Sequence, residues 1–236
     1  MVNVQCSMIK KHIPNTITCC NLISGCIATY FAFQSDFQMA LLFIVIGAVF
    51  DFFDGMSARL LGVSSPIGKE LDSLADDITF GFAPSAIVFS YLTTFDIPHP
   101  YIPYLAFVMA AFSALRLAKF NLDERQSLGF IGLPTPANAL LWGSLVCGLV
   151  ESGAFVAANL WWAILMLVFY ASYLLISEIP MFALKFKHWG WKGNEIKYIF
   201  VISCIPLLLL FGVFSGIAFI IVWYIVLSKI AVLTKK

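Results

Sequence analysis

Long apolar stretches, separated by short polar segments, follow one another along almost the whole chain. A helix that crosses a membrane needs about 20 mostly apolar residues, and eight stretches come close to that length. They lie at 15–34, 37–60, 69–95, 102–120, 135–151, 157–184, 195–212 and 214–233. The pattern therefore predicts an all-α fold, a polytopic transmembrane helix bundle of about eight spans.

The N-terminal residues depart from this pattern. Lys10, Lys11 and His12 lie among apolar residues, which favours a short amphipathic helix on the membrane surface that ends at Pro14. We therefore expect three parts, a surface helix at 1–14, a six-helix core at 15–185 and a two-helix extension at 186–236.

Composition and charge indicate how the bundle is oriented. Apolar residues make up 61% of the chain and charged residues 11%, against about a quarter charged in soluble domains. With the N-terminus inside, all 14 Lys and Arg residues fall on the inner side of the predicted bundle. The positive-inside rule then predicts an integral, multi-pass protein of the cytoplasmic (inner) membrane with both termini cytoplasmic. We expect no nucleic acid partner, and the six cysteines lack the spacing of a zinc site.

Four carboxylates stand out at the inner boundary of the second and third spans. Asp51 and Asp54 are three positions apart, and Asp72 and Asp76 are four apart, so each pair shares one helix face. Carboxylates near hydrocarbon are costly unless a cation or a polar partner compensates. Four oxygen-rich anions predict a site for one or two hard divalent cations, Mg²⁺ or Mn²⁺.

The residues between the acids extend the pattern to phosphate chemistry. The chain reads D-x-x-D-G-x-x-A-R, then eight residues, then G-x-x-x-D-x-x-x-D. Gly55, Ala58 and Gly68 leave room for close approach of a nucleotide or a backbone. Arg59 can give two parallel hydrogen bonds to a phosphate.

This motif resembles that of the CDP-alcohol phosphotransferase family, and all of its defined positions match. The resemblance implies a membrane enzyme that moves a substituted phosphate from a CDP-linked donor to a hydroxyl and releases CMP. It also implies that residues 15–185 form the six-helix core of that family and that the protein is a homodimer. By resemblance, Asp51, Asp54 and Asp72 bind metal, and Asp76 is the catalytic base that also contacts metal. Since an alcohol has a high pKa, a base assists its direct attack on phosphorus.

Two polar residues and a fifth acid lie close to the motif. Asn15 and Thr18 are candidates for contact with the CDP-lipid, although capping of the first span explains them equally well. Asp77 directly follows the motif and is not needed for it.

Further segments point to the acceptor. LRLAKFN at 115–121 and GFIGLPTPAN at 129–138 resemble the phosphatidylserine synthase branch, whose members are membrane-embedded CDP-diacylglycerol–serine O-phosphatidyltransferases. IPNTIT at 13–18 and FGFAPS at 80–85 fit the same branch. The resemblance implies CDP-diacylglycerol and L-serine as substrates in a membrane of lipid.

A serine acceptor needs a cation for its carboxylate. Arg116 is the candidate because its fork suits a carboxylate, and Asn121 and Thr135 are candidates for the serine amine. Glu178 is the alternative partner for Arg116, while Lys119 and Arg125 serve equally well as helix-end anchors.

Other activities stay open at this point. The same chemistry could use glycerol 3-phosphate or inositol phosphate as acceptor, or an archaeal ether-linked lipid as donor in archaetidylserine synthesis. A cation transporter with intramembrane acids is a more remote alternative, because it would place acids near the bilayer midplane in repeated halves.

Overall fold

The computed structural model describes residues 2–122, 130–182, 184, 190–191 and 193–233, with no side-chain description before residue 12. Its helices and strands, in chain order, are α1 (Val2–Phe33), α2 (Phe37–Leu61), α3 (Pro66–Asp76), the π-helix η1 (Asp77–Phe82), α4 (Ala83–Leu92), the 3₁₀-helix η2 (Ile102–Phe107), α5 (Val108–Leu122), β1 (Phe130–Ile131), α6 (Thr135–Ser152), α7 (Ala154–Ala157), α8 (Trp161–Ile176), β2 (Pro180–Met181), α9 (Glu195–Phe211) and α10 (Val213–Leu233).

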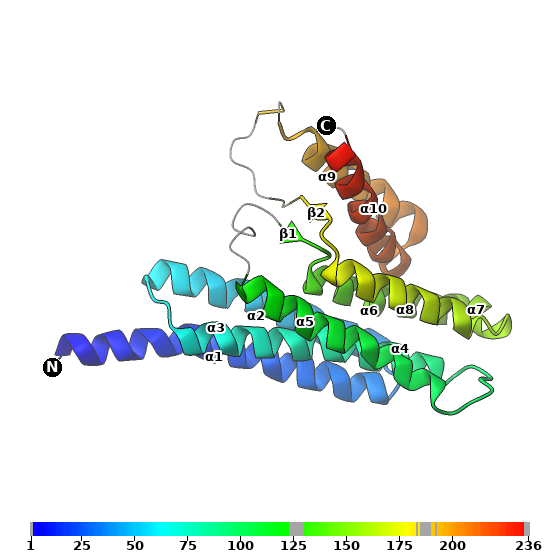
Figure 1. The fold of residues 1–236 in the computed structure, drawn as a ribbon, viewed down its shortest axis with the longest axis horizontal. Coiled ribbons are helices and arrows are strands. Elements are labelled where there is room, and N and C mark those ends of the chain that lie inside the picture. The colour runs from blue at the N-terminus through cyan, green and yellow to red at the C-terminus, as the bar shows by residue number, and fades with distance from the viewer. Residues whose placement is uncertain (1, 123–129, 183, 185–189, 192, 234–236) are drawn as a thin grey trace.

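The helices form two groups (Figure 1). The long helices α1 to α5 run side by side along the longest axis, with α6 and α8 against them, whereas α9 and α10 stand at a steep angle to this layer. Helix α10 packs on α6 as well as on α9 and so joins the groups. Large apolar side chains form the shared core, with Phe80, Ile87 and Trp142 almost fully buried.

The all-α prediction holds, but the span count is confirmed only in part. Every predicted span contains a helix. Among the described residues, four helices are long and apolar enough to cross a membrane, at His12–Phe33, Phe37–Leu61, Ile102–Leu122 and Val213–Ala231. The sixth predicted span stops at Ile176 rather than 184, because Pro180 cannot donate to a helix ladder. The count of eight spans stays a prediction.

The predicted break at Pro14 does not occur. Helix α1 is continuous from Val2 to Phe33 with Pro14 inside it. Proline removes one backbone donor, but the following turn stays regular, and the Thr18 Oγ1 lies 3.0 Å from the Pro14 carbonyl oxygen. A surface position for residues 1–14 stays a prediction, since their first side chains lie outside the described part.

A two-residue antiparallel strand pair was not expected. β1 pairs with β2, with Phe130 opposite Met181. Two further backbone bonds, from Gly132 to Ile179 and from Leu133 to Leu174, extend the contact at 2.9 Å each. This pairing ties the start of α6 to the end of α8.

Close packing of α1, α2 and η1 positions the motif helices. A side chain at Gly47 of α2 would meet the Thr79 Cγ2 at 2.5 Å and the Asn21 Oδ1 at 2.9 Å, which leaves no room for even one methyl group. Since only glycine allows this approach, Gly47 holds Asn21 of α1 and Thr79 of η1 against α2.

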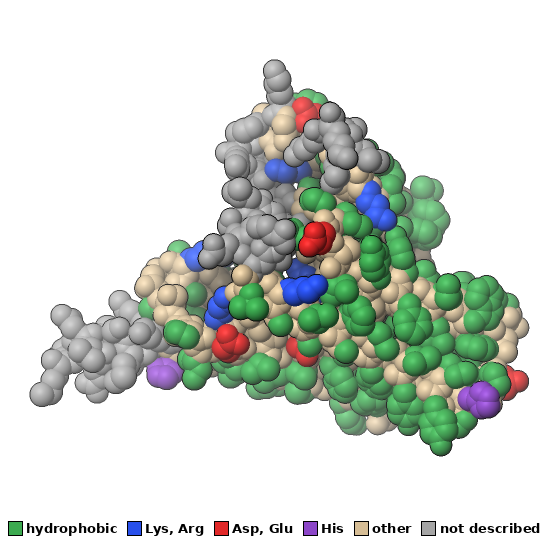
Figure 2. Space-filling model, in the orientation of Figure 1, with side chains coloured by type: hydrophobic (Ala, Val, Ile, Leu, Met, Phe, Trp, Pro, Cys, Tyr) green, Lys and Arg blue, Asp and Glu red, His purple; other side chains and the backbone are tan. Residues whose placement is uncertain are grey.

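Apolar side chains cover much of the face of the molecule that Figure 2 shows. In this view, Lys and Arg lie over the middle of the molecule, toward its N-terminal side and on the upper part that carries α9 and α10. The end of the visible face that carries α7 shows none of them. This uneven distribution is what a membrane protein with one basic side displays.

Candidate active site

A tight turn brings the two halves of the motif together. Helix α2 ends at Gly62, which has a left-handed backbone with a φ of 62°. Helix α3 begins with Pro66 in its first turn and with Ser65 as its cap, whose Oγ accepts a 3.0 Å hydrogen bond from the Gly68 N–H. The turn joins the helices so that their motif acids face one another.

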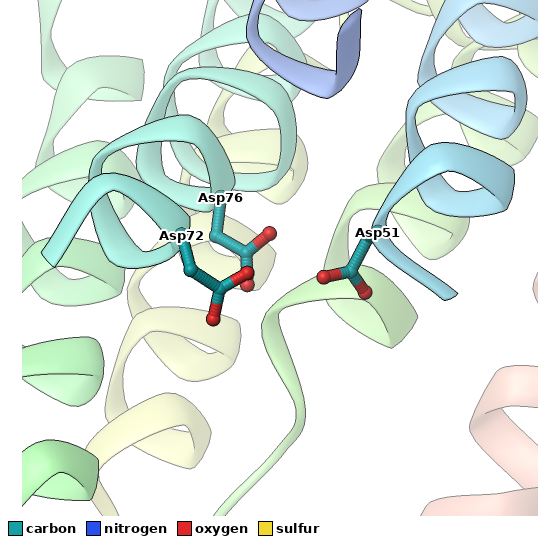
Figure 3. Close-up of side chains that lie close together, drawn as sticks. All are labelled: Asp51, Asp72 and Asp76. Carbon is teal, nitrogen blue, oxygen red and sulfur yellow. The ribbon is translucent and has the colours of Figure 1, made fainter. Parts of the chain in front are cut away.

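Three of the four motif carboxylates converge (Figure 3). Asp72 and Asp76 project from α3 toward Asp51 of α2. One oxygen from each of the three lies within 4.8 Å of the other two. The structure thus brings together one acid of the first helical pair and both acids of the second.

These oxygens suit a hard divalent cation. Mg²⁺ binds oxygen at about 2.1 Å, so two of its ligands lie at most about 4.2 Å apart, and only a small inward movement is required. Within the described part of the chain, no Lys or Arg forms an ion pair with the three acids. A divalent cation would supply a positive charge in direct contact with the three acids.

The fourth motif acid, Asp54, is held apart from this triplet. Its side chain is buried and accepts a 2.7 Å hydrogen bond from the Thr18 hydroxyl of α1. Asp54 lines a neighbouring pocket together with Asp72. Asp54 therefore links the acid triplet to the pocket.

The pocket has a volume of about 270 Å³ and opens between α1, α2 and α3. It contains five of the six residues that the sequence suggested for the CDP-lipid, namely Asn15, Thr18, Gly55, Ala58 and Gly68. Its other lining residues are Pro14, Asp54, Val63, Ser64, Ser65, Lys69 and Asp72. The pocket thus combines the basic side chain of Lys69, small residues and hydroxyl groups, and it lies beside the acids.

Two glycines of the motif differ in what surrounds them. A side chain at Gly68 would meet the Asn15 Oδ1 and the Ser65 Oγ at 2.9 Å each, so packing accounts for that glycine. A side chain at Gly55 would meet only the Arg59 Nη2, at 4.0 Å. Internal packing therefore does not require Gly55, and its open surface faces the pocket.

Arg59 lies outside the pocket lining. Its Nε donates a 3.0 Å hydrogen bond to the Gly55 carbonyl one turn earlier, and the side chain is exposed. This contact leaves the two terminal nitrogens of the guanidinium available to an anion at the pocket edge.

Asn21 is a site residue that the sequence reasoning missed. Its Nδ2 donates to the Asp76 Oδ1 at 3.1 Å, and the residue is fully buried. The signal was present in the sequence, because Asn15, Thr18 and Asn21 recur every three positions in an apolar helix and so fall near one face.

Asp77 does not join the acid triplet. It opens the π-helix directly after Asp76, and its Oδ1 is buried without a hydrogen-bond partner among the described residues. Short π-helical turns are frequent at functional sites. Here the wide turn begins next to the acid cluster and separates Asp77 from it.

Arg116 and Thr135 come together, as candidates for one acceptor site would. The buried guanidinium of Arg116 on α5 lies with its Nη1 3.4 Å from the Thr135 Oγ1 at the start of α6. Glu178, the alternative partner from the sequence, is exposed. In the described part of the chain, the Nε of Arg116 is buried without a partner. Arg116 also lies within electrostatic reach of Asp76.

Asn121 takes another direction. Its Nδ2 donates to the Ser73 Oγ at 2.8 Å, and its carbonyl accepts from the Lys69 Nζ at 2.9 Å. Five positions along a helix rotate a side chain by about 140°, so Asn121 projects from a different face of α5 than Arg116. Asn121 ties α5 to α3.

The other basic candidates contribute less. Lys119 is exposed near the end of α5, and Arg125 lies outside the described residues.

Two more buried residues near the acceptor candidates were missed. Tyr224 of α10 lies within electrostatic reach of Arg116, and its hydroxyl donates to the Phe182 carbonyl at 2.9 Å. Asn138, one turn after Thr135, is fully buried, and neither of its amide atoms has a partner among the described residues. The sequence offered one signal for Asn138, its place in the 129–138 segment. Nothing in the sequence links Tyr224 to Arg116.

Comparison with known proteins identifies the family. The CDP-alcohol phosphatidyltransferase family matches residues 11–147, more than half of the chain. The chain belongs to this family. Its match excludes the transporter alternative as the basis of the acid cluster. The CDP-alcohol phosphotransferases use divalent metal ions, and the acid triplet has the ligands for one.

Similar proteins carry one name. The chain is 42% identical over 128 residues to the CDP-diacylglycerol–serine O-phosphatidyltransferase of Bacillus subtilis (strain 168), covering 53% of this chain and 70% of that protein. The protein of that name from Mycobacterium leprae (strain TN) is 32% identical over 179 residues, 72% of this chain and 57% of that one. The one from Helicobacter pylori (strain ATCC 700392 / 26695) is 32% identical over 191 residues, 80% and 79% respectively.

Proposed function

We propose that this integral membrane protein transfers the phosphatidyl group of CDP-diacylglycerol to the hydroxyl of L-serine, giving phosphatidylserine and CMP. The names of the relatives support the substrates. The observation that carries the chemistry is the acid triplet beside a pocket of about 270 Å³. A CDP-linked donor carries an anionic pyrophosphate, so it requires a nucleotide pocket and a cation site next to one another.

We assign the pocket to the cytidine diphosphate part of the donor. Gly55 and Ala58 offer a surface without bulky side chains, and Arg59 at the edge suits a phosphate. Asp51, Asp54, Asp72 and Asp76 are the proposed ligands of Mg²⁺ or Mn²⁺. The bound cation would neutralise the pyrophosphate and stabilise the departing CMP.

The transfer is proposed as a single displacement. Asp76 accepts the proton of the serine hydroxyl while the serine oxygen forms its bond to the phosphatidyl phosphorus. The bond from that phosphorus to the CMP oxygen breaks, and CMP leaves with the electron pair. A positioned base of this kind typically contributes ~10²–10⁴-fold in rate.

The acceptor site is proposed between Arg116 and Asp76. The two residues lie within electrostatic reach of each other, and the Nε of Arg116 has no partner in the described part of the chain. Serine bound there would offer its carboxylate to Arg116 and its hydroxyl to Asp76. Thr135 beside Arg116 and Tyr224 from α10 are candidates for the wall of this site.

The membrane arrangement is part of the proposal. We infer eight spans, with the acid cluster at the cytoplasmic face and both termini cytoplasmic, because the Lys and Arg residues gather on one side of the predicted bundle. A homodimer is expected from the family resemblance, and native mass spectrometry in detergent would test it.

A CMP-release assay tests the function. Purified protein is incubated with CDP-diacylglycerol, Mg²⁺ or Mn²⁺, and in turn L-serine, glycerol 3-phosphate or inositol phosphate; CMP and the lipid product are both measured. Serine-dependent release with phosphatidylserine formed is the expected result. Faster release with a phosphorylated acceptor would replace the proposed acceptor. Faster release in a parallel assay with a CDP-linked ether lipid would replace the proposed donor.

A further inference from the structure

The contact between Asn21 and Asp76 joins helices that the motif itself does not connect. The amide Nδ2 of Asn21 on α1 donates to the Asp76 Oδ1 at 3.1 Å, across 55 positions of sequence. Asp76 is a member of the acid triplet. Among the three acids, the Asn21 amide therefore hydrogen-bonds to Asp76.

We propose that Asn21 is a positioning residue of the transfer reaction. It holds the carboxylate of Asp76 in the orientation from which Asp76 accepts the proton of the attacking hydroxyl. The inference rests on the proposed function, because it takes Asp76 as the base. Asn21 does not itself contact the substrate in this proposal.

A base in this cluster needs an external support. Asp72 lies one turn before Asp76 on the same face of α3, and Asp51 faces both (Figure 3). Like charges this close repel one another, and a carboxylate rotates readily about its terminal bond. A neutral amide donor engages one oxygen of Asp76 without adding positive charge, and it leaves the other oxygen for the proton or the cation.

The fold holds Asn21 firmly in place. The Thr79 hydroxyl of η1 donates to the Asn21 carbonyl at 3.0 Å, and Gly47 of α2 leaves room for the Asn21 Oδ1 but for no side chain of its own. The amide is thus enclosed between α2 and η1. A side chain enclosed on several sides has few alternative rotamers, which is what orientation of a neighbour requires.

The fold keeps this amide at a cost. Within the described residues, the Asn21 Oδ1 is buried without a hydrogen-bond partner. Leaving a buried acceptor unpaired lowers stability, so an apolar residue of the same size would suit packing better. The amide at this position is explained by its donor contact with Asp76 rather than by packing.

The test replaces the amide by an apolar side chain of the same branched shape. Asn21→Leu removes the donor. Ser24→Ala is the matched control, because Ser24 is buried one turn later on α1 and its hydroxyl donates to the Cys20 carbonyl. For each variant, kcat, the KM of both substrates and binding of CDP-diacylglycerol are measured. Asn21→Leu should lower kcat by roughly 10²-fold, the effect of a misplaced catalytic group, with each KM within about threefold.

A double variant separates positioning from a general structural role. If Asn21 acts through Asp76, Asn21→Leu should cause no further loss in an Asp76→Asn background, since the group it orients is already gone. Equal losses in both backgrounds, or a single variant within about twofold of wild type, would overturn the inference. Asn21→Ser, which is smaller, takes the place of Asn21→Leu if the leucine variant does not fold.

Failure of the proposed function would look different. It would appear as absence of serine-dependent CMP release from the wild-type protein. If the wild type uses another acceptor, the same comparison with that acceptor still decides the role of Asn21.

Discussion

The hydroxyl of Thr18 donates a 2.7 Å hydrogen bond to the buried carboxylate of Asp54, across 36 positions of sequence. The contact joins α1 to the first half of the acid motif. Both residues line the pocket proposed for the donor.

Thr18→Val tests the importance of this contact. A hydrogen bond to a charged group contributes about 1.5–3 kcal/mol, so its loss should raise the KM for CDP-diacylglycerol at least about tenfold. Thr16→Val is the control, because Thr16 is exposed and its hydroxyl donates to the His12 carbonyl of its own helix. Equal KM values for both variants would show that Asp54 does not depend on Thr18.

The acids of the triplet should separate in their roles. Asp76→Asn should lower kcat by ~10²–10⁴-fold while CDP-diacylglycerol still binds. Asp51→Asn should weaken both binding and turnover and raise the metal concentration needed for half-maximal rate. Titration of Mg²⁺ and Mn²⁺ after treatment with a chelator measures this. Turnover of Asp76→Asn near the wild-type rate would remove Asp76 as the base.

Gly55→Ala should make the protein more stable and less active. The new methyl group meets only the Arg59 Nη2 at 4.0 Å, and alanine favours a helix over glycine by roughly 0.5–1 kcal/mol. If the donor lies against Gly55, the methyl group should raise its KM. Thermal unfolding in detergent and initial rates give the two readouts.

Gly47→Ala on the same helix is the opposite case and serves as the control. Its methyl group would meet Thr79 and Asn21, so it should lower the unfolding temperature. A Gly55→Ala enzyme with unchanged KM would place the donor elsewhere.

The transfer should invert the configuration at phosphorus. A single displacement inverts once, whereas a covalent enzyme intermediate gives net retention. The motif serine hydroxyls of Ser57 and Ser73 donate to backbone carbonyls, and Ser64 lines the pocket. We therefore expect inversion with a chiral phosphate donor, and Ser64→Ala should keep its activity. A trapped phosphatidyl-enzyme would contradict this mechanism.

Much of the architecture follows from the order of residues along the chain. Helix periodicity placed Asp72 and Asp76 on one face. The boundary between the predicted spans 195–212 and 214–233 placed the turn between α9 and α10 near Gly212. These features depend on neighbours close in sequence, so local patterns suffice.

Contacts between distant segments were not predictable in this way. The contact between Asn21 and Asp76 spans 55 positions of sequence, and it depends on how the helices pack, as the β1–β2 pairing does. The contact of Asn121 is a further example, because its amide donates to Ser73 on α3, while its proposed acceptor contact stays a prediction. The continuity of α1 through Pro14 has the same origin, since tertiary packing can outweigh the helix-breaking preference of one residue.

Arg116→Lys tests the acceptor site. Arg116 is buried on α5, its Nε has no partner among the described residues, and its Nη1 contacts Thr135 only at 3.4 Å. A buried guanidinium nitrogen without a hydrogen-bond partner is costly, and a substrate carboxylate would supply the missing bond. Because an ammonium cannot reproduce the two-pronged contact, the KM for L-serine should rise substantially while that for CDP-diacylglycerol changes little.

Lys119→Gln is the matched control, since Lys119 is exposed near the end of the same helix and should leave both KM values unchanged. The unfolding temperature of Arg116→Lys completes the comparison. A lower unfolding temperature with an unchanged serine KM would assign Arg116 to the packing of α5 against α6. A raised serine KM in a protein of wild-type stability requires that the guanidinium contacts the acceptor, because no change in packing then accounts for the loss.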